Sequence, residues 1–133
     1  MLTVEINVKG IEEISEEIKR KIERFTDLLL KHTVERLTDK IPVRTGRMRE
    51  SVYVEQHASG FKVGIGAPYA VFVEYGTAPH MIYPVHAKAL RFEVGGEIVF
   101  AKSVFHPGTQ AQWIIHRTTN EIIQDIEMLW EQA

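Results

Sequence analysis

The sequence predicts an α+β domain in which one antiparallel sheet of about five strands is packed by a long N-terminal helix and a C-terminal helix. Three observations lead to this prediction. Apolar residues alternate with polar ones near the N-terminus, as in a strand with one buried face. Two longer segments carry apolar residues every three or four positions, as amphipathic helices do. Between them, short apolar runs are joined by glycine-containing turns, and no long parallel crossovers occur.

The first part of the chain predicts a strand followed by a long helix. Apolar side chains occupy every second position of residues 2–8, and Gly10 ends this run. From residue 11 the spacing changes to three or four, which predicts an amphipathic helix over about residues 11–39. Pro42 follows, and proline does not continue a helix.

The middle of the chain predicts a loop, a hairpin and a short helix. Residues 40–50 are polar and basic, which indicates a loop. Two short β-like runs, residues 51–56 and 61–66, are joined by a glycine-containing connection and predict a hairpin. Residues 68–75 are apolar enough for a buried strand. We favour a helix here, because the segment starts with proline and is followed by Gly76.

The last part predicts a second hairpin and a final helix. Residues 76–87 contain one glycine and two prolines and are expected to form a loop. Residues 89–94 and 97–101 predict strands turned by two glycines, and we expect residues 104–105 to extend this hairpin. A helix follows over about residues 110–131. Apolar residues lie on more than one face of it, which suggests a second packing partner and hence an oligomer.

Length, charge and composition exclude several classes of protein. The chain has 133 residues and no linker or low-complexity tract, so we expect one domain, residues 1–133. Its net charge of −2 gives no general attraction to nucleic acid or to an anionic membrane. The absence of cysteine excludes disulfides and thiolate catalysis. The N-terminus does not resemble a signal peptide, and no apolar run approaches the roughly 20 residues of a membrane span. We therefore expect a cytoplasmic protein without a membrane partner.

One carboxylate and three histidines raise the alternative of a small metal-dependent or acid–base enzyme. Glu74 lies inside an apolar run, and His80, His86 and His106 are chemically suitable metal ligands. No two of these histidines have an i,i+4 spacing on a predicted helix, and no second carboxylate or nucleophile accompanies Glu74. We therefore expect no catalytic residue, no metal site and no cofactor.

A structural or interface role is the preferred interpretation of Glu74. A buried carboxylate needs a partner. Glu74 could pair with Arg44 or Arg91, or accept hydrogen bonds from backbone N–H groups of the loop after Gly76.

Three arginines lie close together in the predicted basic loop. Arg44, Arg47 and Arg49 could form a subunit interface, remain solvated, or contact nucleic-acid phosphates. We prefer the interface, because no aromatic stacking platform lies within the segment. The neighbouring Gly64 and Gly66 form only a GxG, which lacks the rest of a dinucleotide fingerprint.

Several short motifs occur in a fixed order behind the long N-terminal helix. In chain order they are Pro42 with Thr45-Gly46, Met48 and Ser51; Tyr69-Ala70 with Val73-Glu74-Tyr75-Gly76-Thr77; Ala89-Leu90-Arg91-Phe92; and Pro107-Gly108-Thr109. Taken together, over about residues 11–131, they resemble the HK97-type phage tail-component family, the gene-product-10-like group of minor tail and head–tail joining proteins. Members often carry proline and an aromatic residue before the last helix, where this chain has Gln112-Trp113.

The resemblance implies a non-enzymatic component of a phage or prophage that acts at the neck or upper tail during virion assembly. Its expected partners are other phage neck or tail proteins and further copies of itself in a ring. No DNA contact is expected except through the lumen of such a ring. The expected location is the virion, and the host cytoplasm during assembly. The interface candidates are Arg44, Arg47, Arg49, Tyr69, Glu74, Tyr75 and Thr77.

Overall fold

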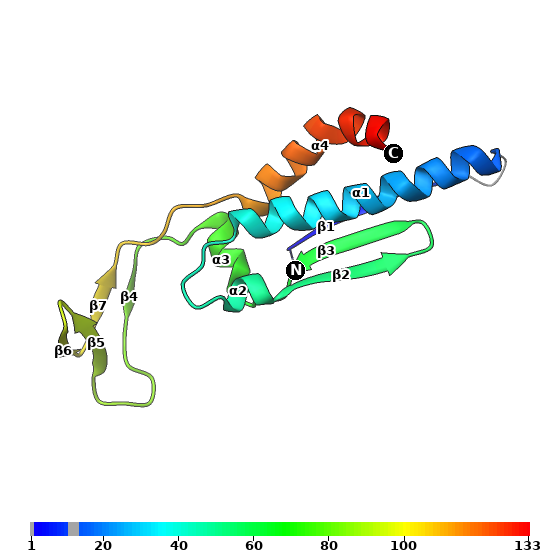
Figure 1. Ribbon diagram of the computed structural model, residues 1–133. Coiled ribbons are helices and arrows are strands. Elements are labelled where there is room, and N and C mark those ends of the chain that lie inside the picture. The colour runs from blue at the N-terminus through cyan, green and yellow to red at the C-terminus, as the bar shows by residue number, and fades with distance from the viewer. Residues whose placement is uncertain (1, 11–13) are drawn as a thin grey trace.

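The computed structural model describes residues 2–10 and 14–133, and Figure 1 shows its helices and strands. In chain order the elements are β1 (Leu2–Asn7), α1 (Glu16–Lys40), α2 (Arg47–Glu50), β2 (Val52–His57), β3 (Gly60–Ile65), α3 (Ala70–Tyr75), β4 (His80–Ile82), β5 (Leu90–Val94), β6 (Glu97–Ala101), β7 (Val104–His106) and α4 (Ile114–Gln132). They form a helix-covered body and a separate β arm.

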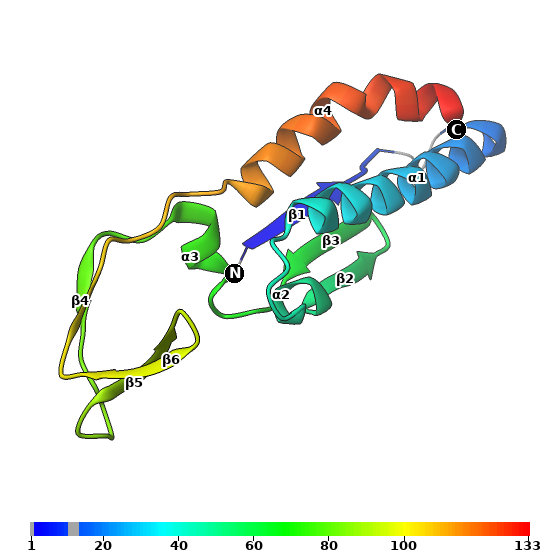
Figure 2. The same cartoon turned by 60° about the vertical axis from the view of Figure 1, so that its left-hand side comes forward.

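The body is a three-stranded antiparallel sheet with both long helices on one side. The strand order is β1-β3-β2, with β3 in the centre. Helix α1 packs on β3 and on α4, and α4 also reaches β1. Figures 1 and 2 show both helices on the same side of the sheet. This half of the prediction is confirmed: an antiparallel sheet is packed by a long N-terminal and a C-terminal helix.

The core lies between the central strand and the two helices. Phe61, Val63 and Ile65 occupy alternate positions of β3, and all three are buried. They meet Leu29 and Leu37 of α1. Because side chains of a strand alternate between faces, this spacing puts every large apolar residue of β3 on the helix side of the sheet.

The arm consists of the remaining four strands. Strand β4 pairs with β7, and β5 pairs with β6, each as an antiparallel two-stranded ribbon. Figures 1 and 2 show these ribbons extending away from the body beyond α3. The expected single sheet of about five strands is therefore wrong. The strands form separate sheets of three, two and two strands.

Two strand assignments are corrected in the arm. Residues 80–82, within the predicted loop, form β4. Residues 104–106 pair with β4 instead of extending the β5–β6 hairpin. Each of these strands has only three residues, too few for a period of two to be recognised, and their partners are far apart in the sequence.

Some helix boundaries also differ from the prediction. Helix α1 begins at Glu16 behind Ser15, whose hydroxyl accepts a hydrogen bond from the Ile18 amide at 3.4 Å. Residues 11–13, where we expected the helix to start, lie outside the described residues. Residues 47–50 form the short helix α2 in the predicted basic loop. The helical assignment of residues 68–75 is confirmed by α3, and α4 starts at Ile114, four residues later than expected.

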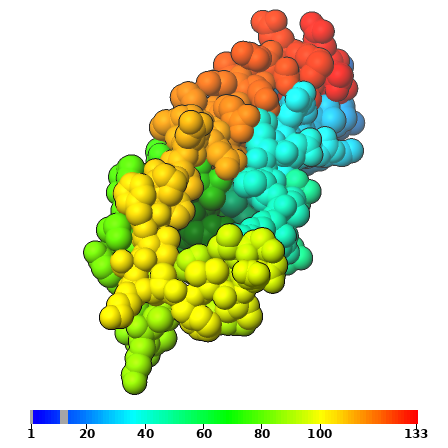
Figure 3. Space-filling model, turned by 90° about the vertical axis from the view of Figure 1, so that its left-hand side faces the viewer, coloured from blue at the N-terminus to red at the C-terminus, as the bar shows by residue number. Residues whose placement is uncertain are grey.

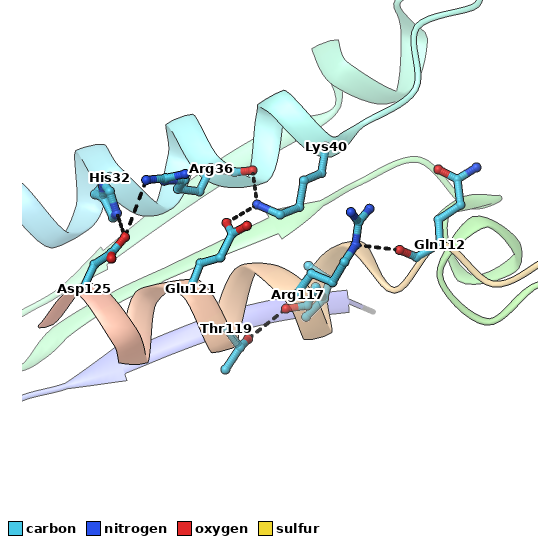
Figure 4. A network of polar contacts seen from close by, with 9 residues as sticks. His32, Arg36, Lys40, Gln112, Arg117, Thr119, Glu121 and Asp125 are labelled. Atoms are coloured by element: carbon cyan, nitrogen blue, oxygen red, sulfur yellow. Dashed lines mark hydrogen bonds and ion pairs between the residues drawn. The ribbon is translucent and has the colours of Figure 1, made fainter.

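Ion pairs fix the register of α1 against α4 (Figure 4). The Asp125 carboxylate lies 2.8 Å from His32 Nε2 and 3.6 Å from Arg36 Nη2. One helical turn further along the pair, Lys40 forms an ion pair with Glu121 and donates a hydrogen bond to the Arg36 carbonyl at 2.9 Å. The Lys40 side chain is only 10% exposed, so its charge depends on these partners.

We expect Glu121→Ala to lower the free energy of unfolding by about 1–2 kcal/mol, because it leaves the largely buried Lys40 ammonium without its carboxylate. Chemical denaturation followed by circular dichroism measures this change. The double variant Lys40→Met/Glu121→Leu should recover most of the loss, since an apolar pair needs no charge partner. Equal stability of Glu121→Ala and the control Glu127→Ala, which removes an exposed carboxylate of the same helix, would contradict the assignment.

Candidate interaction surface

Glu74 is an interior residue that caps helix α4. It is 3% exposed, and its two carboxylate oxygens accept hydrogen bonds from the backbone amides of Ile115 at 2.8 Å and His116 at 3.2 Å. The first amides of a helix have no partner within the helix and carry its positive end. The Glu74 carboxylate accepts hydrogen bonds from two of these amides and places a negative charge at the positive end of the helix. The expected backbone N–H donors are therefore present, but these donors belong to α4 and not to the loop after Gly76. Neither Arg44 nor Arg91 forms an ion pair with Glu74.

Backbone contacts reinforce the junction between α3 and α4. The Gln112 amide donates to the Val73 carbonyl at 3.0 Å, and the Trp113 amide donates to the Glu74 carbonyl at 3.1 Å. Trp113 adopts the left-handed conformation at φ 51°, and its ring packs edge-on against Tyr75 at 5.5 Å between centroids. Tyr75 therefore belongs to the packing around the start of α4, although its side chain is also 58% exposed.

An open pocket of about 450 Å³ lies between the basic segment and α3. Arg44, Arg47 and Tyr69 line it, together with apolar parts of Met48 and Val73. Among the described residues, neither guanidinium forms an ion pair or a hydrogen bond. Three of the seven interface candidates thus meet at one concave surface that combines positive charge with an apolar wall.

The remaining arginine candidate faces the body. Arg49 donates a hydrogen bond from Nη2 to the Ile41 carbonyl at 3.3 Å, where α1 ends. This contact anchors α2 to the C-terminus of α1. Arg49 therefore stabilises the position of the segment that contains Arg44 and Arg47.

Thr77 belongs to a clasp at the base of the arm, which we define as Gly76-Thr77 and Gly108-Thr109. The two threonines form an isolated antiparallel bridge, with both N–H···O distances at 3.1 Å and the two hydroxyl oxygens 3.1 Å apart. A Cβ atom on Gly76 would lie 2.5 Å from the Thr109 carbonyl oxygen. The two backbone segments therefore approach to a distance that only glycine permits. The clasp joins the two segments whose Gly-Thr pairs stand out in the sequence.

The histidines do not surround Glu74. The rings of His80 and His106 stack on each other in the arm at 4.9 Å between centroids, and Glu74 lies at α4 with both oxygens bonded to amides. Within residues 2–10 and 14–133, no group of three or more residues is arranged to hold a metal ion. No helix in this part of the chain is long and apolar enough to cross a membrane.

The arm exposes large apolar side chains that the sequence reasoning did not identify as functional. They are Met81, Tyr83, Val85, Phe92, Val94, Ile98, Phe100 and Phe105. In the space-filling view of Figure 3 this arm forms the lower part of the molecule. The signal was present, because residues 98–101 are apolar at successive positions of a hairpin strand, so that both faces carry apolar side chains.

Helix α4 exposes a second apolar surface. Its members are Ile123, Ile126 and Trp130, which lie on one side of the helix, and Ile123 is 63% exposed. The inner face of the helix buries Ile114, Ile122 and Leu129. The observation agrees with the surplus of apolar residues seen in the sequence of this helix. Surfaces of this kind are common at sites of protein association.

A comparison with known families matches residues 8–76 to the family described as "Bacteriophage HK97-gp10, putative tail-component". No curated protein and no solved structure matches the chain. The matched segment begins directly after β1, runs through α3 and holds the residues that line the pocket, Glu74 and Gly76 of the clasp. It covers just over half of the 133 residues. The chain therefore belongs to the HK97-gp10-like family of phage tail components.

Proposed function

We propose that this protein is a structural component of the phage neck or upper tail that joins head and tail during virion assembly. It acts without catalysis, as a ring of identical copies in contact with other neck or tail proteins. It is made in the host cytoplasm and becomes part of the virion.

The observation that carries the proposal is the arm. A folded body and a projecting arm of two two-stranded ribbons with exposed apolar side chains suit a subunit that completes its packing in an assembly. Soluble monomers rarely expose large contiguous apolar patches, and such patches mark association sites. Membership in a family of tail components supports the same conclusion.

A ring requires a heterologous interface, in which one patch of a subunit meets a different patch of the next. The pocket lined by Arg44, Arg47 and Tyr69 provides one patch, and the arm beyond Thr77 provides another. Arginine and tyrosine are among the residue types enriched at interfaces. The other candidates act indirectly on the proposed interface. Arg49 holds α2 against α1, and Glu74 and Tyr75 hold the start of α4.

We expect Arg47→Glu to reduce incorporation into particles by about tenfold or more, because it reverses a charge of the pocket at the proposed interface. Complementation of a phage that lacks the gene, with counting of infectious particles, measures the effect. Circular dichroism should show an unchanged fold, since the Arg47 side chain is exposed.

Arg20→Glu is the matched control, because Arg20 is an exposed arginine on the opposite end of the body in α1. It should support normal particle yield. Simultaneous charge reversal of Arg44, Arg47 and Arg49 without loss of assembly would refute the proposed interface, and particles with a single copy of the protein would refute the ring.

A further inference from the structure

The β5–β6 hairpin at the end of the arm has apolar side chains on both faces. Facing residues of an antiparallel pair point to the same side, and successive residues alternate. Phe92 and its partner Val99 therefore share one face with Val94, while Ile98 and Phe100 lie on the other. Ile98 is 54% exposed and Phe100 is 66% exposed. An isolated two-stranded hairpin is at best marginally stable in water, so this one needs a surface to pack on.

The tip of this hairpin is acidic as well as apolar. Glu97 faces Val94 next to the two-glycine turn, and Glu93 faces Ile98 one step further back. Both glutamates are exposed, and neither has an ion pair or a hydrogen bond among the described residues. The tip thus presents one carboxylate on each face of the hairpin, and Glu97 shares its face with Val94.

The pocket on the body has the complementary chemistry. Arg44 and Arg47 contribute two unpaired guanidinium groups at its rim, and Tyr69, Met48 and Val73 contribute apolar wall. Its volume of about 450 Å³ lies within the range that accommodates small ligands, and a few side chains at a hairpin tip are of similar size. Arginine binds carboxylates in a bidentate manner, which also fixes orientation.

The arm carries its hairpin away from its own pocket. From the clasp at Thr77 to the end of β4 at Ile82, an extended segment spans about 17 Å, at about 3.3 Å per residue. Figures 1 and 2 both show β5 and β6 apart from α2 of the same chain. The pocket that accepts the hairpin tip is therefore expected to belong to a neighbouring copy of the protein.

We propose that the β5–β6 tip of one copy docks into the Arg44–Arg47 pocket of the next copy. Glu97 pairs with the guanidinium groups of Arg44 and Arg47, and Val94, on the same face of the hairpin, packs on Tyr69 and Val73. This inference rests on the ring proposed above and names the contact that closes it. The two patches differ in shape and charge, which is the requirement for a heterologous interface.

The chain has no cysteine, so engineered cysteines give an unambiguous cross-linking test. Val94→Cys and Thr45→Cys proteins are mixed at a concentration at which the wild type assembles, alone or with the neighbouring tail proteins, and are then oxidised. A disulfide forms only where the two Cα atoms come within about 7 Å. We expect covalent dimers in about tenfold excess over the control mixture of Val94→Cys with Glu17→Cys, an exposed site on α1.

Charge exchange provides the second part of the experiment. Glu97→Lys and Arg47→Glu should each reduce assembly by about tenfold, because each brings like charges together. In a mixture of these two variant proteins, contacts between copies of the same variant bring like charges together and only contacts between the two different variants are favourable, whereas the double variant Glu97→Lys/Arg47→Glu restores the pair at every contact. We expect the double variant to assemble better than either single variant.

Each outcome has a defined consequence. If the wild type assembles but Val94→Cys and Thr45→Cys cross-link no better than the control, the docking inference is wrong and the ring stands. A disulfide within one chain of the Val94→Cys/Thr45→Cys double variant at high dilution would show that the hairpin docks on its own body and would also overturn it. Cross-linking of Val94→Cys to a different tail protein has the same consequence. A wild type that stays monomeric with its tail proteins overturns the proposed function itself.

Discussion

Glu74→Ala is expected to lower the free energy of unfolding by about 3 kcal/mol, because it removes two hydrogen bonds from a charged acceptor to backbone amides. Glu74 is almost completely buried, so water does not readily replace the lost oxygens at the Ile115 and His116 amides. The favourable interaction of the carboxylate with the positive end of α4 is lost at the same time. Thermal and urea denaturation followed by circular dichroism give the change.

The intermediate variant Glu74→Gln separates the contributions. Its amide keeps one oxygen acceptor but turns an NH₂ group toward the second backbone amide, so we expect a loss of about 1–2 kcal/mol. Glu127→Ala removes an exposed carboxylate from the C-terminal half of α4 and should change stability by no more than about 0.5 kcal/mol. If Glu74→Gln destabilised no more than Glu127→Ala, the capping role would be refuted. A turnover activity abolished by Glu74→Gln in a folded protein would instead revive the acid–base enzyme.

Local patterns in the sequence were sufficient to predict the long helices and two of the hairpins. Alternation over residues 2–8 predicted β1, and helical spacing predicted α1 and α4. Glycine-containing turns predicted the β2–β3 and β5–β6 hairpins. These signals are local because a helix or a hairpin is formed by residues that are close in the sequence.

Pairings between distant segments could not be predicted in the same way. A hairpin that joins a sheet and one that stands alone have the same local pattern, so the sequence did not distinguish a five-stranded sheet from a body with an arm. The Glu74 carboxylate and the amides that it caps are 41 and 42 residues apart. Its burial and need for backbone donors could be inferred from one apolar run, but the identity of the donors depends on how α3 and α4 meet.

The seven predicted interface residues illustrate the same limit. Residue type and proximity in the sequence grouped them together, whereas the fold separates them by role. Arg44, Arg47 and Tyr69 line the pocket, and Arg49 faces α1. Glu74 and Tyr75 hold α4, and Thr77 belongs to the clasp. The apolar arm was not included, because its strands were expected to be buried in one sheet.

Gly108→Ala is expected to open the clasp and to abolish assembly while leaving the body folded. Gly108 has φ +82°, where an L-residue costs about 1–2 kcal/mol. A Cβ atom there would also overlap the Thr77 carbonyl oxygen and lie 2.9 Å from the Ala78 carbonyl carbon. The clash is with backbone, so no side-chain rotation relieves it. The arm has few contacts with the body, and its displacement is the least costly response.

Hydrogen exchange measures this opening directly. The amides of Thr77 and Thr109 are bonded to each other's carbonyls, and we expect them to exchange about 100-fold faster in Gly108→Ala, equivalent to about 2.7 kcal/mol. Gly10→Ala is the matched control, because Gly10 has a similar φ of +78° but open space around the new methyl group. Unchanged exchange at Thr77 and Thr109 in Gly108→Ala, relative to this control, would show that the clasp does not depend on glycine.

The Gly108 and Glu74 variants should fail in different ways, and this difference tests where function is located. Glu74→Ala weakens the body through α4, so its effect on assembly should disappear at temperatures where the variant is fully folded. Gly108→Ala leaves the hydrogen bonds of Glu74 intact but disturbs the direction in which the arm leaves the body. Its assembly defect should therefore persist at every temperature. A defect that vanished on cooling in both variants would mean that the arm's direction is irrelevant to assembly.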